Sequence, residues 1–132
     1  LAIRTRTPTQ VLRLSRASIN AIAAKDAAAV SSQLGALLAI NYGFVLDVYA
    51  AFRRVHPVER VAAMILNVMT GFPMHPRRIS VNQADLGSIT MLSRSTVSSV
   101  VAELERRGWI RVQYGLIEII DEDGLREFVG NP

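Results

Sequence analysis

The densest run of chemically capable side chains is Ser93-Arg94-Ser95-Thr96-Val97-Ser98-Ser99, in which one arginine stands among hydroxyl residues. A serine becomes a nucleophile only beside an activating base, and no histidine or lysine lies near this run. The two histidines, His56 and His75, each precede a proline, and no carboxylate pair or metal-ligand spacing surrounds them. The sequence therefore predicts a binding segment rather than an enzyme, and we expect no catalytic, metal or cofactor site in this chain.

A helix has to position this run. Ser93 can cap a helix that continues to about Arg107, because its hydroxyl can accept a hydrogen bond from a free N–H in the first turn. The apolar stripe of this helix has helical spacing and consists of Val97, Val100, Val101 and Leu104. Gly108 is expected to end the helix.

The neighbouring segments complete a small module. A shorter helix is predicted over residues 83–90, because Asn82 followed by Asp85 is typical of a helix start. Two such helices around a tight turn make a helix-turn-helix. Beyond Gly108, residues 109–120 form two apolar runs around Tyr114-Gly115, which predicts a β-hairpin, or wing. We therefore expect a mainly α fold with a small β-hairpin, in which residues 81–120 form a winged helix-turn-helix.

A long helix precedes this module. Asp26 can cap it, and the His56-Pro57 pair is expected to end it. Its 4-3 spacing is typical of a coiled-coil seam, which comprises Leu34, Leu38, Asn41, Val45, Val48, Phe52 and Val55. A single seam asparagine favours a two-stranded state, because its amide pairs with its twin. The pattern therefore predicts a homodimer.

Two other interpretations of this long helix stay open. It could be an amphipathic helix packed on its own domain. It could also cross a membrane, because residues 34–52 are mostly apolar and long enough for a span. Asp47 argues against a span, since a carboxylate near the bilayer centre costs about 2.5–3.5 kcal/mol. We therefore expect no membrane partner.

The charge pattern supports nucleic-acid binding only in part. The formal net charge is +4, which favours an anionic partner. However, residues 1–72 hold 8 Lys+Arg against 3 Asp+Glu, whereas residues 73–132 hold 7 against 8 and include an acidic tail over 118–127. A winged helix used for protein contact or assembly, without specific DNA binding, is therefore the alternative function. The absence of cysteine suits a reducing cytoplasm, where we expect the protein to reside.

Several segments together resemble CRP/FNR-type bacterial transcription regulators. Those in the winged module are Asn82-Gln83-Ala84-Asp85-Leu86, the run from Ser93 to Ser99, and Leu104-Glu105-Arg106-Arg107-Gly108-Trp109-Ile110. Upstream, Arg13-Leu14-Ser15 is similar to the last strand of the cyclic-nucleotide-binding-like β-roll of that family, and residues 3–14 are expected to include a strand. The resemblance implies a remnant of an effector domain at 1–25, a dimerisation helix at 26–56 and a winged helix-turn-helix DNA-binding domain at 57–132. The chain would then be the C-terminal piece of a longer protein.

The resemblance also implies residue roles. The protein would bind a palindromic operator as a homodimer, with the helix from Ser93 in the major groove. Arg94 matches the main base-reading arginine of the family, which can contact guanine O6 and N7. The other base contacts would come from Ser95 and Ser99, where a glutamate and a second arginine are common. Phosphate contacts are expected from Ser93, Thr96, Ser98, Arg77, Arg78 and Arg111.

Four further expectations follow from the same resemblance. Met91 stands where many members have the turn glycine, so we expect a different turn geometry. Trp109 and Tyr114 should pack and turn rather than stack on bases. Val45 and Leu46 match positions where cyclic-AMP-responsive members offer hydroxyls, and neither can donate a hydrogen bond. This chain is therefore not expected to bind a cyclic nucleotide, the effector of the parent protein stays open, and RNA polymerase would be a partner if the protein is an activator.

Overall fold

The computed structural model describes residues 8, 10–70 and 77–130, which fall into two compact units, Leu1–Gly43 and Phe44–Pro132. The first unit holds α1 (Arg16–Ala23) and the first part of α2 (Ala27–Phe52). Ser15 Oγ accepts a hydrogen bond from the Ser18 N–H at 3.0 Å, and Asp26 Oδ1 accepts one from the Ala29 N–H at 2.9 Å. Ser15 therefore caps α1, and the predicted start of the long helix at Asp26 is confirmed.

The strand predicted ahead of Ser15 is not found in the described residues. Residues 10–15 have no regular secondary structure, whereas residues 1–7 and 9 lie outside the described part. A strand is stable only when neighbouring strands take up its backbone hydrogen bonds. The strands that the structure describes pair among themselves in the order β1-β3-β2, so residues 10–15 have no ladder to join.

Helix α2 is mostly apolar, and Ala51 is its single buried residue. By length and composition alone it could cross a membrane, with a mean hydropathy of 1.5. It ends at Phe52, four residues before the predicted end at His56, and Val55 lies beyond it with 81% of its surface exposed. The prediction that Val55 extends the helical seam is therefore wrong.

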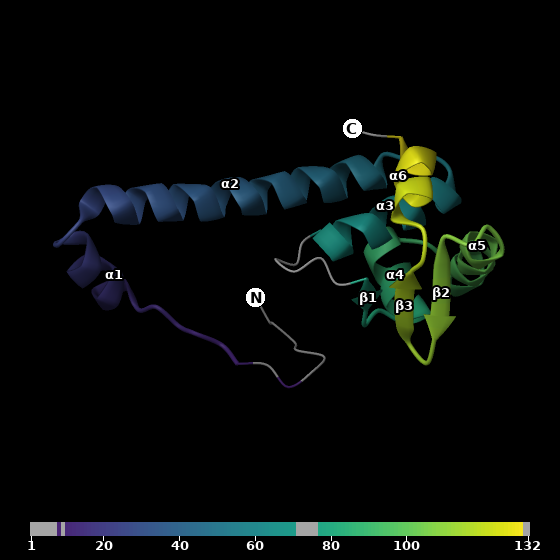
Figure 1. Ribbon diagram of the computed structural model, residues 1–132, viewed down its shortest axis with the longest axis horizontal. Helices are drawn as coiled ribbons and strands as arrows, with labels where there is room; N and C mark the ends of the chain where they lie inside the picture. The colour runs from purple at the N-terminus through teal and green to yellow at the C-terminus, as the bar shows by residue number, and fades with distance from the viewer. Residues whose placement is uncertain (1–7, 9, 71–76, 131–132) are drawn as a thin grey trace. The chain divides into compact units, whose positions relative to one another are not determined.

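The second unit contains the winged module (Figure 1). Its helices are α3 (Pro57–Thr70), α4 (Gln83–Thr90), α5 (Arg94–Arg106) and α6 (Glu122–Val129). Its strands are β1 (Arg78–Ile79), β2 (Ile110–Gln113) and β3 (Leu116–Ile119), all antiparallel. The predicted hairpin is thus confirmed, and β1 extends it to a three-stranded sheet.

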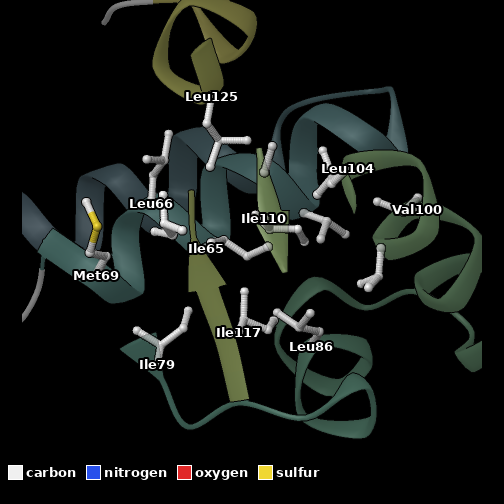
Figure 2. Close-up of a cluster of buried hydrophobic side chains, with 14 of the residues drawn as sticks. Ile65, Leu66, Met69, Ile79, Leu86, Val100, Leu104, Ile110, Ile117 and Leu125 are labelled. Carbon is white, nitrogen blue, oxygen red and sulfur yellow. The ribbon is translucent and has the colours of Figure 1, made fainter. Parts of the chain in front are cut away.

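One continuous core holds this module together. Figure 2 shows side chains from every helix of the module and from the sheet converging on it, including Ile65 of α3, Leu86 of α4, Leu104 of α5 and Ile117 of β3. Helix α3 runs through the centre, so its residues 61–66 and Met69 are all buried. The core therefore fixes the orientation of α5, on which the sequence places the binding run.

Helix α6 corrects the prediction of an acidic tail. Asp121 caps it by accepting a hydrogen bond from the Gly124 N–H at 2.9 Å, and Leu125 is completely buried in the core. The acidic residues Glu122 and Asp123 occupy its first turn, where negative charge is favourable. The acidic residues of this segment indicated a charged tail, whereas the structure shows that the helix also has an apolar face.

Candidate nucleic-acid interface

Helix α5 has two clearly different faces. Its inward face is buried in the core and consists of Val97, Val100, Val101 and Leu104. Its outward face carries exposed polar side chains from the predicted binding run, namely Arg94, Ser95, Ser98 and Ser99. The core therefore leaves this set of predicted contacts free on one side of a rigidly held helix.

The hydroxyls at the start of α5 form a local network. Ser93 Oγ accepts a hydrogen bond from the Thr96 N–H at 3.1 Å, which confirms Ser93 as the N-cap. The same oxygen lies 2.9 Å from Ser95 Oγ and 2.8 Å from Thr96 Oγ1. Backbone N–H groups in a first helical turn have no acceptor within the helix and attract anions. The network thus orders the end of α5 that a phosphate would approach.

The turn before α5 is held by an unusual backbone conformation. Met91 has φ 55° and ψ 37°, the left-handed region that glycine enters readily. The turn therefore has the conformation that glycine favours, contrary to the expectation of a different geometry. For a methionine this conformation costs about 1–2 kcal/mol. Asn82 and Asp85 form the predicted capping box at the other end of α4.

Arg60 stabilises the same turn from α3. Its Nε and Nη2 donate to the Arg54 carbonyl oxygen at 3.1 and 2.8 Å, and its Nη1 donates to the Thr90 carbonyl oxygen at 3.4 Å. The buried Thr90 hydroxyl donates to the Leu86 carbonyl oxygen at 2.5 Å. One guanidinium thus connects the link after α2 with the turn before α5. The Arg54 carbonyl oxygen that it holds lies just beyond the end of α2.

The wing carries a row of charges across its three strands. Glu118 is paired in register with Arg78 on one side and Arg111 on the other. Arg78 Nε lies 3.0 Å from Glu118 Oε1, and Arg111 Nη1 lies 3.6 Å from Glu118 Oε2. Arg77 is exposed, and its carbonyl oxygen accepts the Ile119 N–H at 2.8 Å. Two of the predicted phosphate contacts are therefore already paired with one carboxylate.

A second charged cluster closes α5. Hydrogen bonds from Arg106 and Arg107 lower the pKa of Glu103 below its ordinary value. The Arg107 guanidinium carbon also lies 4.9 Å from the ring centroids of both Trp109 and Phe128. Trp109 therefore packs within the domain, as predicted.

The predicted hairpin turn is also confirmed. Tyr114 and Gly115 both have positive φ, 46° and 82°, as a two-residue type I′ turn requires. Gly108, at φ 76°, ends α5 as expected.

The protein family is identified by a sequence match over the segment that forms this module. Residues 59–128 match the Crp-like helix-turn-helix domain. The chain belongs to this family. None of the curated proteins matches it.

Solved structures of regulators resemble this Crp-like chain. A CRP-family transcriptional regulator from Thermus thermophilus is 22% identical, with a TM-score of 0.62 over 78% of this chain and 55% of its own. A CRP/FNR-family regulator from the same organism is 29% identical, with a TM-score of 0.52 over 75% and 51%. The catabolite activator protein of Thermus thermophilus is 25% identical, with a TM-score of 0.50 over 88% and 53%. The chain thus spans about half the length of these proteins, which are transcription regulators rather than enzymes.

The seam of this Crp-like chain is only partly accessible. Leu34, Leu38, Asn41 and Val45 are exposed, and the Asn41 amide donates to the Leu37 carbonyl oxygen at 2.8 Å. Val48 and Phe52 are half-buried, because they pack against a cluster formed by Ala51, Ala63 and Met64. The exposed part of the predicted seam is therefore residues 34–45, about half of what the spacing indicated.

Two residues of the site were missed by sequence reasoning. Arg60 lies inside the segment that resembles the family, but no local pattern assigns it a partner 30 residues away. Glu118 was counted only as part of an acidic tail, although the hairpin register places it opposite Arg111. Among the described residues, no cluster of His, Asp and Glu side chains could hold a metal ion.

Proposed function

We propose that this chain binds a palindromic DNA operator as a homodimer, with α5 in the major groove. The observation that carries the proposal is Arg94. It is exposed at the start of α5, and in the part of the chain that the structure describes its guanidinium forms no ion pair. Arg78, Arg106, Arg107, Arg111 and Arg126 are each paired with a carboxylate, and Arg60 is held by carbonyl oxygens. Arg94 is thus an uncommitted cation on a firmly packed helix of a size that fits a major groove.

The neighbouring side chains have complementary roles in this proposal. Arg94 donates two hydrogen bonds to a guanine, which is worth about 1–3 kcal/mol of discrimination against another base. Ser95 and Ser99 contact adjacent base edges, and as short hydroxyls they tolerate several bases. Ser93, Thr96 and Ser98 hold phosphate oxygens near the N-terminus of α5, where unpaired N–H groups assist them. Phosphate contacts from the wing side come from Arg77, Arg78 and Arg111.

Dimerisation supplies the second half-site. The exposed seam over residues 34–45 presents Leu38 and Val45, which would pair with the same residues of a second copy. Asn41 would exchange its present bond to the Leu37 carbonyl for a bond with its twin. In helix-turn-helix dimers the two recognition helices lie about 34–36 Å apart, one turn of DNA. Residence in the cytoplasm, and contact with RNA polymerase if the protein is an activator, belong to the same proposal.

A membrane position for α2 is less consistent with its C-terminal part. Asp47 lines an open cavity of about 230 Å³ whose polar members are Arg54, Asn67 and Arg126, beside apolar ones such as Leu66 and Val129. A partner helix removes the apolar side chains of α2 from water without burying that carboxylate. Retention of the purified chain in the aqueous phase without detergent is expected, and extraction only by detergent would contradict a soluble dimer.

The decisive experiment compares Arg94→Ala with the native chain on DNA selected from a random duplex pool. Loss of Arg94 should reduce the preference for the selected sequence by about 10-fold or more and leave generic duplex binding largely intact. Fluorescence anisotropy on selected and generic duplexes measures both quantities. Arg106→Ala is the matched control, because it removes the same charge from the other end of α5. Equal preference in the native and Arg94→Ala chains would contradict the assigned role.

Protein contact without specific DNA binding is the second candidate. The extensive pairing of arginines in the winged module favours it, because paired cations attract phosphates less. DNA binding requires that affinity falls steeply with salt. If the native chain fails to bind any duplex at low salt, the protein-contact function replaces the proposed one.

A further inference from the structure

The charge row on the wing has a defined geometry. Because Arg78, Glu118 and Arg111 are paired directly across adjacent strands, their side chains project from the same face of the sheet. The neighbouring residues Ile117 and Ile119 point the other way and are buried in the core. The row therefore sits on a platform that fixes the backbone positions of its three charged residues side by side.

The exposures within the row differ. The Glu118 side chain is 24% exposed, whereas those of Arg78 and Arg111 are 71% and 57% exposed. Arg78 uses its Nε toward the carboxylate, and Arg111 uses one terminal nitrogen. A guanidinium has five N–H donors, so each arginine keeps donors for another acceptor. Two largely exposed cations thus share a single anion, which is more enclosed than either of them.

We infer that Glu118 is a built-in counter-ion that competes with DNA phosphates for Arg78 and Arg111. The inference rests on the proposed DNA binding. A phosphate that approaches the wing meets a row with a net charge of about +1 rather than +2, and it must share the guanidinium donors with a fixed carboxylate. Since phosphate neutralisation is the sequence-independent part of DNA binding, Glu118 lowers affinity for any duplex. Its role is to limit the sequence-independent affinity of the wing for DNA, so that contacts from α5 decide which sequence the protein binds.

The test is the salt dependence of binding to a generic duplex by Glu118→Gln. The amide keeps the shape and one hydrogen-bond acceptor but removes the negative charge. We expect binding to become about 3- to 10-fold tighter at low salt, and the slope of log K against log salt to steepen by about 0.9, the value for one more neutralised phosphate. Unchanged or weaker binding would overturn the inference.

Glu122→Gln is the matched control. It makes the same change in net charge and also releases one arginine, because Glu122 pairs with Arg126 at 2.7 Å, but it does so on α6. An effect equal to that of Glu118→Gln would mean that net charge alone acts, and it would overturn the local role. Thermal unfolding by circular dichroism checks that each variant is folded.

A variant cycle separates this inference from the proposed function. In an Arg78→Gln/Arg111→Gln background, Glu118→Gln should no longer tighten binding, because both cations that the carboxylate pairs with are gone. A persistent gain there would contradict the counter-ion role. If the native chain binds duplex and only the Glu118 effect is missing, the inference alone fails. If the native chain binds no duplex at any salt concentration, the proposed function and the inference both fail.

Discussion

Helices α2 and α5 both carry apolar stripes, but they use them differently. Helix α5 buries four apolar residues and presents a polar outward face, so its own domain covers its apolar stripe completely. Helix α2 buries only Ala51 and exposes large side chains such as Leu38 and Tyr49. Burial of one such side chain is worth about 1.5–3 kcal/mol. The comparison teaches that α5 is positioned by its fold, whereas the fold leaves most of the apolar surface of α2 uncovered.

The strongest test of this contrast truncates a leucine on each helix. Leu104→Ala on α5 should lower the free energy of unfolding by about 2–5 kcal/mol, because it leaves a cavity in the core. Leu38→Ala, at a side chain that is 71% exposed, should change the stability of the monomer by less than about 0.5 kcal/mol. Urea denaturation at low protein concentration measures both. Similar losses for the two variants would break the comparison.

A charged residue introduced into the seam tests whether a second copy of the chain covers α2. Val45→Glu should weaken self-association by about 100-fold or more, because the carboxylate would be buried in the pair without a partner. Ala36→Glu, an exposed position between Leu34 and Leu38 that the seam does not use, should leave association unchanged. Sedimentation velocity across a concentration series distinguishes them. A Val45→Glu chain that remains dimeric would refute the seam.

The hydrogen bonds of Arg60 to the Arg54 and Thr90 carbonyl oxygens are expected to help position α5. Arg60→Ala should reduce stability by about 1–3 kcal/mol, since it leaves two carbonyl oxygens without a charged donor. Arg53→Ala, an exposed arginine in the neighbouring link, is the control and should be close to neutral. Hydrogen exchange at the Leu92 amide, which bonds to the Gly87 carbonyl at 3.1 Å, should accelerate only in Arg60→Ala. Equal exchange in both variants would remove Arg60 from the positioning of the turn.

The smallest effect concerns strain in the turn. Met91→Gly should stabilise the domain by about 0.5–1 kcal/mol, because glycine adopts a positive φ without steric cost. The methionine side chain is 80% exposed, so its loss removes little burial. Met91→Ala loses the same side chain but keeps the strain, and it should not stabilise. A gain in thermal midpoint for alanine equal to that for glycine would exclude strain as the cause.

The features that sequence predicted are those encoded by neighbouring residues. Asn82 with Asp85, Ser93, and Tyr114-Gly115 mark a helix start, a second helix start and a turn within a few positions, and each is found where expected. The four buried residues of α5 follow from their spacing alone. The match to the Crp-like domain extends the same local patterns over residues 59–128.

The features that sequence missed depend on residues far apart. The hydrogen bonds of Arg60 to the carbonyl oxygens of Arg54 and Thr90 join segments that no periodicity connects. The pairing of Glu118 with Arg78 requires the position of β1, which lies 40 residues away along the chain. Helix α6 is encoded by neighbouring residues, since Asp121 precedes Leu125, Phe128 and Val129 at helical spacing, but its acidic residues indicated only a charged tail.

The hydrogen bond from Arg60 to Thr90 also has a consequence for the order of folding. The caps of α4 and α5 close over three residues, so they can form as soon as each helix does. The contact between α3 and the turn spans 30 residues and requires both segments to have docked on the core. Because closing so long a loop costs entropy before any contact repays it, we expect α5 to form early and to acquire its final orientation late.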